Sequence, residues 1–489
     1  MDPVTARRER ACGVLLGAAA GDALGAGYEF ARPRRPEEPV AMIGGGLGPF
    51  QPGEWTDDTA MAIPIAEAAA TGADLRSEAA LNAIVDRWYG WSQRAKDIGV
   101  QTSSVLRAAH QRGLSAQTAR AEAAALHRRT GRSAGNGSLM RTAPVALAFL
   151  DDEAGLVQAA RTISELTHFD PDAGDACVLW CAAIRHGVLT GELDARIGLA
   201  HLDGAARRLW EQRLDEAEAS HPADFAARNG WVVAALQGAW SAIAGTPVPQ
   251  EDPAAGAFGA DHVRLALEAA VRGGGDTDTV AAIAGGLLGA VWGASAVPAH
   301  WRMLLHGWPG LTARGLIRLS EQILRGGRPD TFDYTYRGYP EARRPVRHPH
   351  DDGVWIGGVA ALRHLPEDVG AVVSLCRIAD GDVPAGAQQL DVRLIDADGE
   401  NLNLGFVLLD TVRAIEQLRA EGRTVFLHCV QAYSRTPTIA ALYGARRAGI
   451  DIDDALREVV AVLPEAHPRG EFRVALRRLQ PAARTAGTG

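Results

Sequence analysis

The residues Gly273-Gly274-Gly275-Asp276-Thr277-Asp278-Thr279 form the stretch around which the chain is organised. Three consecutive glycines leave a turn without side chains, so the backbone can bend freely or approach a ligand closely. The carboxylates and hydroxyls that follow offer only oxygen donors, which suit a hard cation such as magnesium, manganese or calcium. The next run, 280–297, has no charged residue and consists mostly of Ala and Gly. It predicts a buried core helix rather than a membrane span.

A second cluster with the same donor types lies far upstream, at Thr56-Asp57-Asp58-Thr59. Both clusters precede apolar helical runs, so each could simply supply helix N-caps. The alternative is that the two clusters meet in space, where their carboxylates would repel one another unless one or two divalent cations neutralised them. The repeated Thr/Asp/Asp pattern favours this metal site. Its predicted ligands are Thr56, Asp57, Asp58, Asp276, Asp278 and Thr279.

The length of 489 residues predicts two or three domains. Residues 8–327 carry apolar residues at helical spacing and little strand-like alternation, which predicts an all-α domain. Residues 328–350 are rich in Pro, Arg, Tyr and His and are predicted to be a linker. Residues 351–482 alternate short strand-like runs with helical stretches, which predicts an α/β domain with a central, mostly parallel sheet. Strands are expected at 354–356, 371–375, 392–395 and 424–427.

The composition excludes some partners and compartments. Apolar residues make up 47% and charged residues 22%, which is typical of a globular protein, and the net charge of −9 argues against an obligate nucleic-acid partner. The five cysteines are odd in number and form no CxxC pair, so a reducing, cytoplasmic compartment is expected. The N-terminal segment 1–17 is interpreted as a domain helix rather than a signal peptide, and no membrane partner is expected.

The loop Asn136-Gly137-Ser138 is a candidate for binding a pyrophosphate through its backbone N–H groups, because a helical stretch follows it. The alternative is a turn that only separates two helices.

Five motifs, in this order, resemble the ADP-ribosylglycohydrolase family over about residues 8–330. They are Gly21-Asp22-Ala23-Leu24-Gly25, Trp55-Thr56-Asp57-Asp58-Thr59, Asn136-Gly137-Ser138-Leu139-Met140-Arg141, Thr167-His168 and Gly274-Gly275-Asp276-Thr277-Asp278-Thr279. The resemblance implies an all-α fold and two bound magnesium ions, with manganese as a substitute. It also implies hydrolysis of the bond that joins ADP-ribose to a protein side chain or to a small leaving group; the sequence does not separate these two substrates.

The resemblance also implies roles for individual residues. It assigns the two acidic clusters to the metals, places Glu29 near the substrate and Asp97 near the scissile bond, and puts Met140 and His168 in the substrate cleft. Glycoside cleavage passes through an oxocarbenium-like state, and metal ions can hold the ribose hydroxyls and lower the pKa of the attacking water. Asp57 or Glu29 would act as the general acid or base.

A second chemistry is predicted at Cys429-Val430-Gln431-Ala432-Tyr433-Ser434-Arg435, a Cys-x5-Arg loop between a strand and a helix. The backbone N–H groups of such a loop and the helix N-terminus bind an oxyanion and lower the pKa of the cysteine, which becomes a thiolate nucleophile. Arg435 would bind two phosphate oxygens, and Thr436 could hydrogen-bond the sulfur as it leaves. A buried strand-end cysteine followed by chance by an arginine is the alternative, which the strand–loop–helix order disfavours.

Residues from about 350 to 480 resemble the cysteine-dependent dual-specificity and tyrosine phosphatases. The resemblance implies that Asp396 protonates the leaving oxygen of a phosphorylated substrate, with Asp398 as the competing candidate. The chain departs from the family at Ala432, where the family usually has Gly, and Ala costs about 1 kcal/mol if φ is positive there. Two hypotheses therefore stand: a bifunctional hydrolase with an active phosphatase domain, or a glycohydrolase whose C-terminal domain only binds phosphate.

Overall fold

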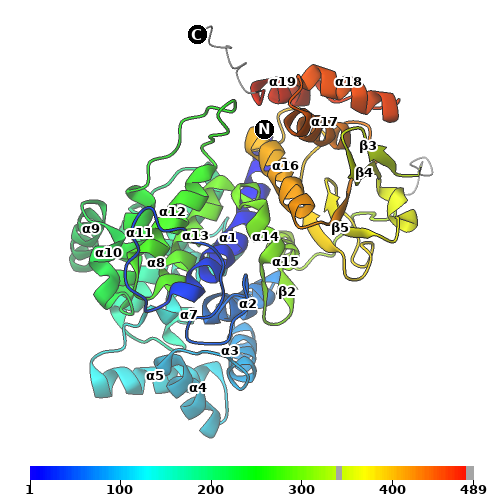
Figure 1. Ribbon diagram of the computed structural model, residues 1–489. Helices are drawn as coiled ribbons and strands as arrows, with labels where there is room; N and C mark the ends of the chain where they lie inside the picture. Colours follow the sequence, from blue (N-terminus) through cyan, green and yellow to red (C-terminus); the bar gives the residue numbers. More distant parts are fainter. Residues whose placement is uncertain (337–343, 481–489) are drawn as a thin grey trace.

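The computed structural model describes residues 1–336 and 344–480, which form a helical domain and an α/β domain (Figure 1). This arrangement confirms the predicted fold classes. The helices of the first domain are α1 (Pro3–Gly25), α2 (Asp57–Ala70), α3 (Glu78–Ser92), α4 (Val100–Gln111), α5 (Ala116–Thr130), α6 (Ala143–Ala148), α7 (Glu153–Glu165), α8 (Pro171–Thr190), α9 (Gly204–Glu218), α10 (Pro222–Phe225), α11 (Val232–Ala244), α12 (Asp261–Gly273), α13 (Thr277–Trp292), α14 (Ala299–Leu304) and α15 (Ala313–Arg325). A short hairpin, β1 (His306–Gly307) and β2 (Leu311–Thr312), precedes α15.

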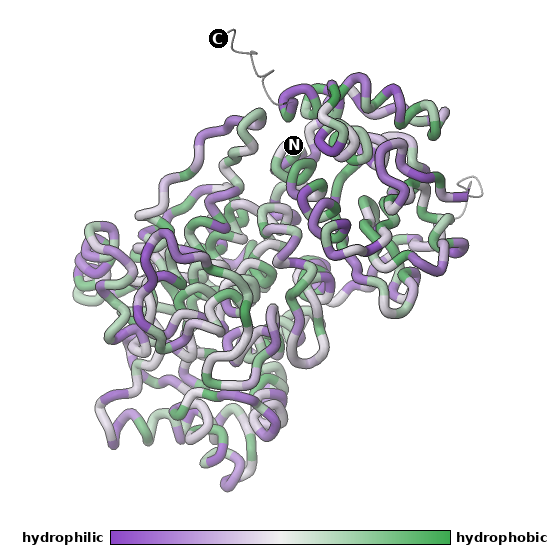
Figure 2. The backbone as a smooth tube through the Cα atoms, in the orientation of Figure 1, coloured by the Kyte–Doolittle hydropathy of each residue, from purple (hydrophilic) through white to green (hydrophobic). Residues whose placement is uncertain are grey.

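Helices α1 and α13 form the centre of the helical domain, where their backbones touch. A Cβ added at Gly17 would lie 2.3 Å from the carbonyl oxygen of Gly285, and one added at Gly289 would lie 1.9 Å from that of Gly13. Only glycine allows two helices to approach so closely. The tube coloured by hydropathy shows apolar segments gathered through the interior of this domain (Figure 2). Consequently the C-terminal end of α1 lies beside the N-terminus of α13.

Helix α1 is the one helix in the described residues that is long and apolar enough to cross a membrane, counted as the span Pro3–Tyr28. The apolar part of this span is 94% buried inside the protein, as expected for a core helix. The apolar run 280–297 behaves as predicted: α13 is buried from Thr277 to Val291.

The α/β domain contains, within the described residues, a five-stranded sheet of order β3-β4-β7-β5-β6. All its neighbouring pairs are parallel except the β3–β4 pair, which confirms a mostly parallel sheet. Its elements are β3 (Val346–His348), β4 (Asp351–Gly358), β5 (Val369–Ser374), β6 (Gln388–Asp391), α16 (Leu404–Ala420), β7 (Thr424–Cys429), α17 (Arg435–Ala448), α18 (Ile452–Val462) and α19 (Gly470–Arg478).

Three of the four expected strands are present, but the prediction of a strand at 392–395 is wrong. The sheet uses β6, directly before it, and residues 392–395 leave the sheet. Tertiary contacts override the strand propensity there: the Arg393 guanidinium reaches Glu321 of the helical domain, and the Leu394 carbonyl accepts a hydrogen bond from Arg435. Strand β3 lies inside the segment predicted as a linker, and residues 337–343 of that segment lie outside the described residues.

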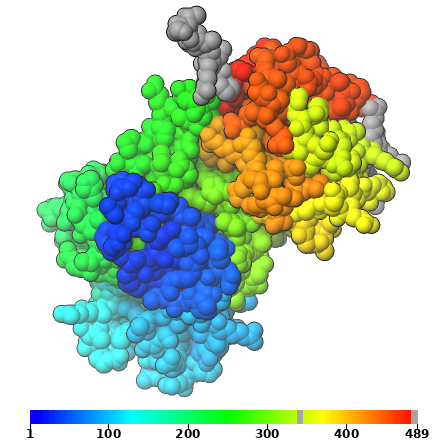
Figure 3. All heavy atoms as spheres, viewed as in Figure 1, coloured from blue at the N-terminus to red at the C-terminus, as the bar shows by residue number. Residues whose placement is uncertain are grey.

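The two domains are joined through α16, which packs against the helical domain. The amide of Asn403 donates to the Trp292 carbonyl at 2.8 Å and to Ser295 Oγ at 2.9 Å, and the Ala299 N–H donates to Asp410 at 2.8 Å. In the space-filling view the α/β domain, coloured yellow to red, is a separate lobe seated on the helical domain (Figure 3).

Candidate functional site

Carboxylates from α1, α2 and α13 converge in one buried cluster. Oxygen atoms of Asp22, Asp58 and Asp278 lie within 4.8 Å of one another, and so do those of Glu29, Asp276 and Asp278. The first three side chains are almost fully buried. The structure therefore brings the two predicted acidic clusters together, at the N-termini of α2 and α13.

Thr56 lies at the centre of this cluster. Its hydroxyl is 2.9 Å from Asp22 Oδ1, 3.0 Å from Asp58 Oδ2 and 3.3 Å from Asp278 Oδ2. Its backbone N–H donates to Asp22 Oδ1 at 2.8 Å, and the Thr59 N–H donates to Asp22 Oδ2 at 3.0 Å. Asp22 thus fixes the first turn of α2 against α1.

Helix capping does not explain Asp58 and Asp276. Asp276 precedes α13 but its side chain makes no cap hydrogen bond, and Thr56 makes none for α2. Asp276 instead accepts a hydrogen bond from the Asn136 amide at 2.7 Å. Asp58 Oδ1 is buried and has no hydrogen-bond donor among the described residues. An oxygen in this position is available to a cation.

The electrostatics of the cluster also favour the binding of a cation. Burial, with the nearby charges of Asp97, Asp22 and Asp276 added, raises the pKa of Asp57 to about 8. Burial and neighbouring carboxylates likewise raise the pKa of Asp58 and of Asp278 well above the ordinary value. Carboxyls that must lose protons against such repulsion gain from a divalent ion in their midst.

The residues present fit magnesium or manganese, because the donors are all oxygens and several are carboxylates. The buried hydroxyl of Thr59, like Asp58 Oδ1, has no hydrogen-bond partner in the described part of the chain. Thr279, the sixth predicted ligand, is buried, and its hydroxyl lies 3.9 Å from the sulfur of Met140. The structure thus places Met140 beside the cluster.

Glu29 and Asp97 lie on the more open side of the cluster, where both are partly exposed. Burial, with Asp276 and Asp97 as the nearest charges, raises the pKa of Glu29 to about 8. The N–H of Gly99, in the same segment as Asp97, donates to Asp57 Oδ2 at 3.3 Å. A recess of about 540 Å³ opens there, and Asp57, Asp97, Trp55, Trp91 and Trp308 are among its lining residues.

The Asn136–Ser138 turn packs on His168. A Cβ at Gly137 would lie 3.2 Å from the imidazole Cε1, which is a tight contact, so the turn and the imidazole are closely packed. His168 is buried and bonded through Nδ1 to Thr167 Oγ1 at 2.7 Å, and burial lowers its pKa well below the ordinary value, which keeps it neutral. Ser138 is fully buried with Oγ 3.7 Å from Cys177 Sγ, so its side chain faces the core.

Sequence reasoning missed Asp22 and Asn229. Asp22 belongs to a quoted motif but was not among the predicted ligands, although a carboxylate inside a glycine- and alanine-rich helix is a signal for a buried charged site. Asn229 accepts the N–H of Asp276 at 2.9 Å and donates to the Gly274 carbonyl at 3.0 Å. Gly274 and Gly275 both have positive φ, so Asn229 holds the predicted glycine turn in place.

The Cys429 loop lies at the carboxyl end of the central strand β7, before α17. Ala432 has φ +57°, the left-handed conformation that the family's glycine would adopt freely. Among the described residues the backbone N–H groups of 431–434 have no hydrogen-bond acceptor. Unpaired N–H groups in succession, followed by a helix N-terminus, form an anion-binding cradle.

The other predicted residues of this loop have protein partners. Arg435 Nη1 donates to the carbonyls of Leu375 at 2.8 Å and Leu394 at 3.0 Å, while its Nε is buried with no hydrogen-bond partner in the described chain. Thr436 is buried and donates to the Gly357 carbonyl at 3.4 Å. Asp396 Oδ2 is 3.7 Å from Arg435 Nε, and its Oδ1 accepts a hydrogen bond from Arg469 at 2.9 Å.

Comparison with known proteins gives relatives for both parts of the chain. The sequence model of the ADP-ribosylglycohydrolase family matches residues 3–330, which confirms the resemblance carried by the five motifs. The ADP-ribosylarginine hydrolase Tri1 of Pseudomonas putida (strain GB-1) is 29% identical over 298 residues, 60% of this chain and 73% of the relative. The ADP-ribosyl-[dinitrogen reductase] glycohydrolase of Rhodospirillum rubrum is 29% identical over 301 residues, 60% of this chain and 89% of the relative.

The α/β domain is similar to dual-specificity phosphatases, as its motif predicted. Dual specificity protein phosphatase 1 of Arabidopsis thaliana is 32% identical over 135 residues, which cover 27% of this chain and 65% of that protein.

Proposed function

The chain belongs to the ADP-ribosylglycohydrolase family, and from that premise we propose a magnesium-dependent hydrolase. Its helical domain cleaves the glycosidic bond of ADP-ribosylated protein side chains or of small ADP-ribosyl compounds. The observation that carries this proposal is the buried cluster of Asp22, Asp58 and Asp278, whose oxygens lie within 4.8 Å of one another.

Each group of residues has a role in this proposal. The carboxylates of the two acidic clusters and Asp22 hold the cations, with Thr56 and Thr279 beside them. A bound divalent ion supplies positive charge that polarises the attacking water and holds the ribose hydroxyls. Without the cation the carboxyls of Asp57 and Glu29 both have pKa values raised to about 8. Both carboxyls remain candidates for the general acid or base, and a bound cation would lower both pKa values from this level.

Arginine is the proposed leaving side chain. The relatives named for their substrate include an ADP-ribosylarginine hydrolase. The recess beside Asp57 contains Asp97, which forms no ion pair with the described residues, whereas Lys96 is already paired with Glu54 at 2.7 Å. A free carboxylate in an aromatic-lined recess suits a guanidinium, which binds carboxylates through paired hydrogen bonds and stacks on rings.

The test offers ADP-ribosylarginine and ADP-ribosylserine peptides and small ADP-ribosyl compounds to the full chain, with and without magnesium, and follows ADP-ribose release. We expect magnesium-dependent release, fastest from arginine. Asp276→Ala should abolish metal binding and leave the α/β domain folded. No turnover of any of these compounds by the wild-type protein with metal bound would refute the glycohydrolase proposal.

We further propose that the α/β domain is a phosphatase. The Cys429 thiolate attacks phosphorus, the P–O ester bond breaks, and the leaving oxygen takes a proton from Asp396. Water then attacks phosphorus and gives a proton to the Asp396 carboxylate, the S–P bond breaks, and the thiolate and inorganic phosphate are released. Two observations support this role: the unpaired N–H groups of 431–434 and the adoption of the required backbone conformation by Ala432. Asp398 is exposed, whereas Asp396 lies beside Arg435, which favours Asp396 as the acid.

A phosphate-binding module without catalysis is the second candidate for this domain. It is favoured by Arg435 and Thr436, which donate hydrogen bonds to the backbone carbonyls of Leu375 and Gly357. Hydrolysis of p-nitrophenyl phosphate by the wild type and by Cys429→Ser separates the two. Equal inactivity of both proteins, with phosphate still bound, would establish the module.

A further inference from the structure

A cavity of about 450 Å³ lies between the two domains, and Val430 and Arg435 of the Cys429 loop are among its lining residues. Val430, Arg435 and Asp396 line it from the α/β domain. Its opposite wall comes from the helical domain, through Val4, Thr5, Arg8 and Glu9 of α1 and Arg314, Ile317, Arg318 and Glu321 of α15. A site for phosphate in one domain is thus walled by the other.

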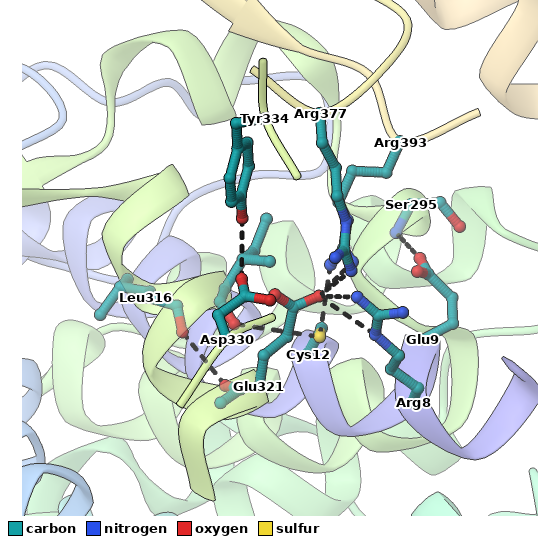
Figure 4. A network of polar contacts seen from close by, with 12 residues as sticks. Arg8, Glu9, Cys12, Ser295, Leu316, Glu321, Asp330, Tyr334, Arg377 and Arg393 are labelled. Carbon is teal, nitrogen blue, oxygen red and sulfur yellow. Dashed lines mark hydrogen bonds and ion pairs between the residues drawn. The ribbon is translucent and has the colours of Figure 1, made fainter. Parts of the chain in front are cut away.

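The wall is held by ion pairs across the domain junction. Glu321 of α15 is nearly buried, and one of its oxygens receives Arg8 of α1 at 2.5 Å, Arg377 of the α/β domain at 3.0 Å, and Arg393 (Figure 4). Arg318 of α15 pairs with Asp380. Charged contacts from three segments to one buried carboxylate hold the two domains in one arrangement, so the cavity has fixed walls.

The cavity is positively charged in an acidic protein. Six arginines and four carboxylates line it, a net charge of +2 for the lining residues, or +1 when Asp380, the partner of Arg318, is added; the whole chain carries −9. A phosphomonoester dianion neutralises that excess. The arginine beside the loop, Arg435, has a buried Nε with no hydrogen-bond partner among the described residues.

Three aromatic side chains line part of the cavity. Phe332, Tyr334 and Tyr336 belong to the segment after α15 and all face the cavity. The phenyl ring of Phe332 packs edge-on against Tyr334 at 4.8 Å, receives the Arg377 guanidinium at 5.1 Å, and is still 38% exposed. A large exposed ring inside a charged cavity is a surface that a planar ligand ring can cover.

We propose that this inter-domain cavity is the substrate cleft of the α/β domain, and that its substrate is a small phosphomonoester carrying a planar ring, of nucleoside monophosphate size. The phosphate occupies the Cys429 loop and the ring packs on the Phe332 surface. The volume is that of a small-molecule site, and residues of the helical domain close one side of it. This inference rests on the proposed phosphate-binding role of the Cys429 loop.

The test is calorimetric titration of full-length Cys429→Ser, which cannot turn over substrate, with adenosine 5′-monophosphate, glycerol 3-phosphate and a phosphotyrosyl peptide. We expect the nucleotide to bind at least about ten-fold more tightly than either other ligand. Adding Phe332→Ala should weaken nucleotide binding about five-fold and leave glycerol 3-phosphate binding within about two-fold.

The helical-domain wall is tested by adding Val4→Trp, which places a large ring at the cavity, against Val248→Trp in an exposed loop of the same domain. Val4 is 72% exposed and Val248 51% exposed, so both variants should fold, and retained ADP-ribose release checks this. We expect Val4→Trp to weaken nucleotide binding at least about five-fold and Val248→Trp to leave it unchanged.

The outcomes separate this inference from the proposed activities. Peptide binding as tight as nucleotide binding, or equal effects of the two tryptophan variants, would overturn the cleft. Suppose that nucleotide binding responds to Phe332→Ala and Val4→Trp as expected, but the wild type hydrolyses no phosphomonoester. The cavity would then be supported as a binding site, and the phosphatase activity would be refuted. If the protein hydrolyses phosphomonoesters at a rate that neither Val4→Trp nor Phe332→Ala changes, the phosphatase activity is supported and the proposed cleft is refuted.

Discussion

The carboxylate cluster and the Cys429 loop are built by opposite means. The cluster gathers side chains from three remote segments, α1, α2 and α13, and the backbones of α1 and α13 are in contact at glycines. The loop is one continuous stretch that presents backbone N–H groups at the end of β7. The first site concentrates negative charge, and we propose that it binds a cation. The second presents backbone N–H groups, and we propose that it binds an anion directly.

This difference predicts different weaknesses. The assembled site should fail when helix packing is disturbed or when the cation is removed. The contiguous loop should tolerate both and fail when its own atoms are changed. Each of the following variants tests one side of that contrast.

The largest effect is expected for Cys429→Ser, because it removes the nucleophile. Phosphomonoester hydrolysis should fall at least about 10⁴-fold. Magnesium-dependent release of ADP-ribose, measured on the same preparation, should stay within about two-fold. Loss of both activities together would contradict the independence of the two sites.

Gly285→Ala tests the packing beneath the carboxylate cluster. An added Cβ would lie 2.0 Å from the Gly17 carbonyl oxygen, so the helices must separate; we expect a loss of about 3 kcal/mol in the stability of the helical domain. The matched control is Gly286→Ala, whose Cβ meets nothing closer than 3.5 Å. Urea unfolding should show the control unchanged or slightly stabilised. Similar unfolding midpoints for the two variants would contradict the glycine contact.

Asp22→Asn should weaken magnesium binding about 10- to 100-fold, because Asp22 fixes the first turn of α2 and adds charge to the cluster. Calorimetry with magnesium measures the affinity, and Asp86→Asn on the exposed face of α3 serves as the control. Unchanged affinity in Asp22→Asn would mean that the cation lies elsewhere.

Ala432→Gly should have the smallest effect. Glycine at φ +57° relieves about 1 kcal/mol of backbone strain, which corresponds to at most about a five-fold gain in phosphate affinity. Titration with inorganic phosphate measures it. Weaker binding in the glycine variant would indicate that the Ala432 methyl group supports the loop.

The contiguous site was the easier one to predict. Cys429, Arg435 and the strand–loop–helix order stand together in the sequence, and the positive φ of Ala432 follows from its place in the motif. Some donors of the assembled site could be predicted, because Asp58 and Asp278 stand in short acidic motifs directly before apolar helical runs. Asp22 could not be predicted as part of the site, because its contribution depends on the packing of α1 against α13. That contact is made by glycines far apart in the chain.

Other features depend on tertiary contacts that no local pattern reports. Residues 392–395 look like a strand but turn away from the sheet toward Glu321 in the helical domain. The cavity between the domains likewise arises only when α1 and α15 meet the α/β domain. Its charge comes from arginines of both domains, which are unremarkable one at a time in the sequence.

The contrast between the two sites is tested most directly by removing the metal. Both activities of the full-length protein are measured after dialysis against EDTA and again after magnesium is added. We predict that ADP-ribose release from an ADP-ribosylarginine peptide is abolished by EDTA and restored by magnesium, while p-nitrophenyl phosphate hydrolysis is unchanged throughout. ADP-ribose release that persists at the full rate without metal would contradict a cation-dependent carboxylate site.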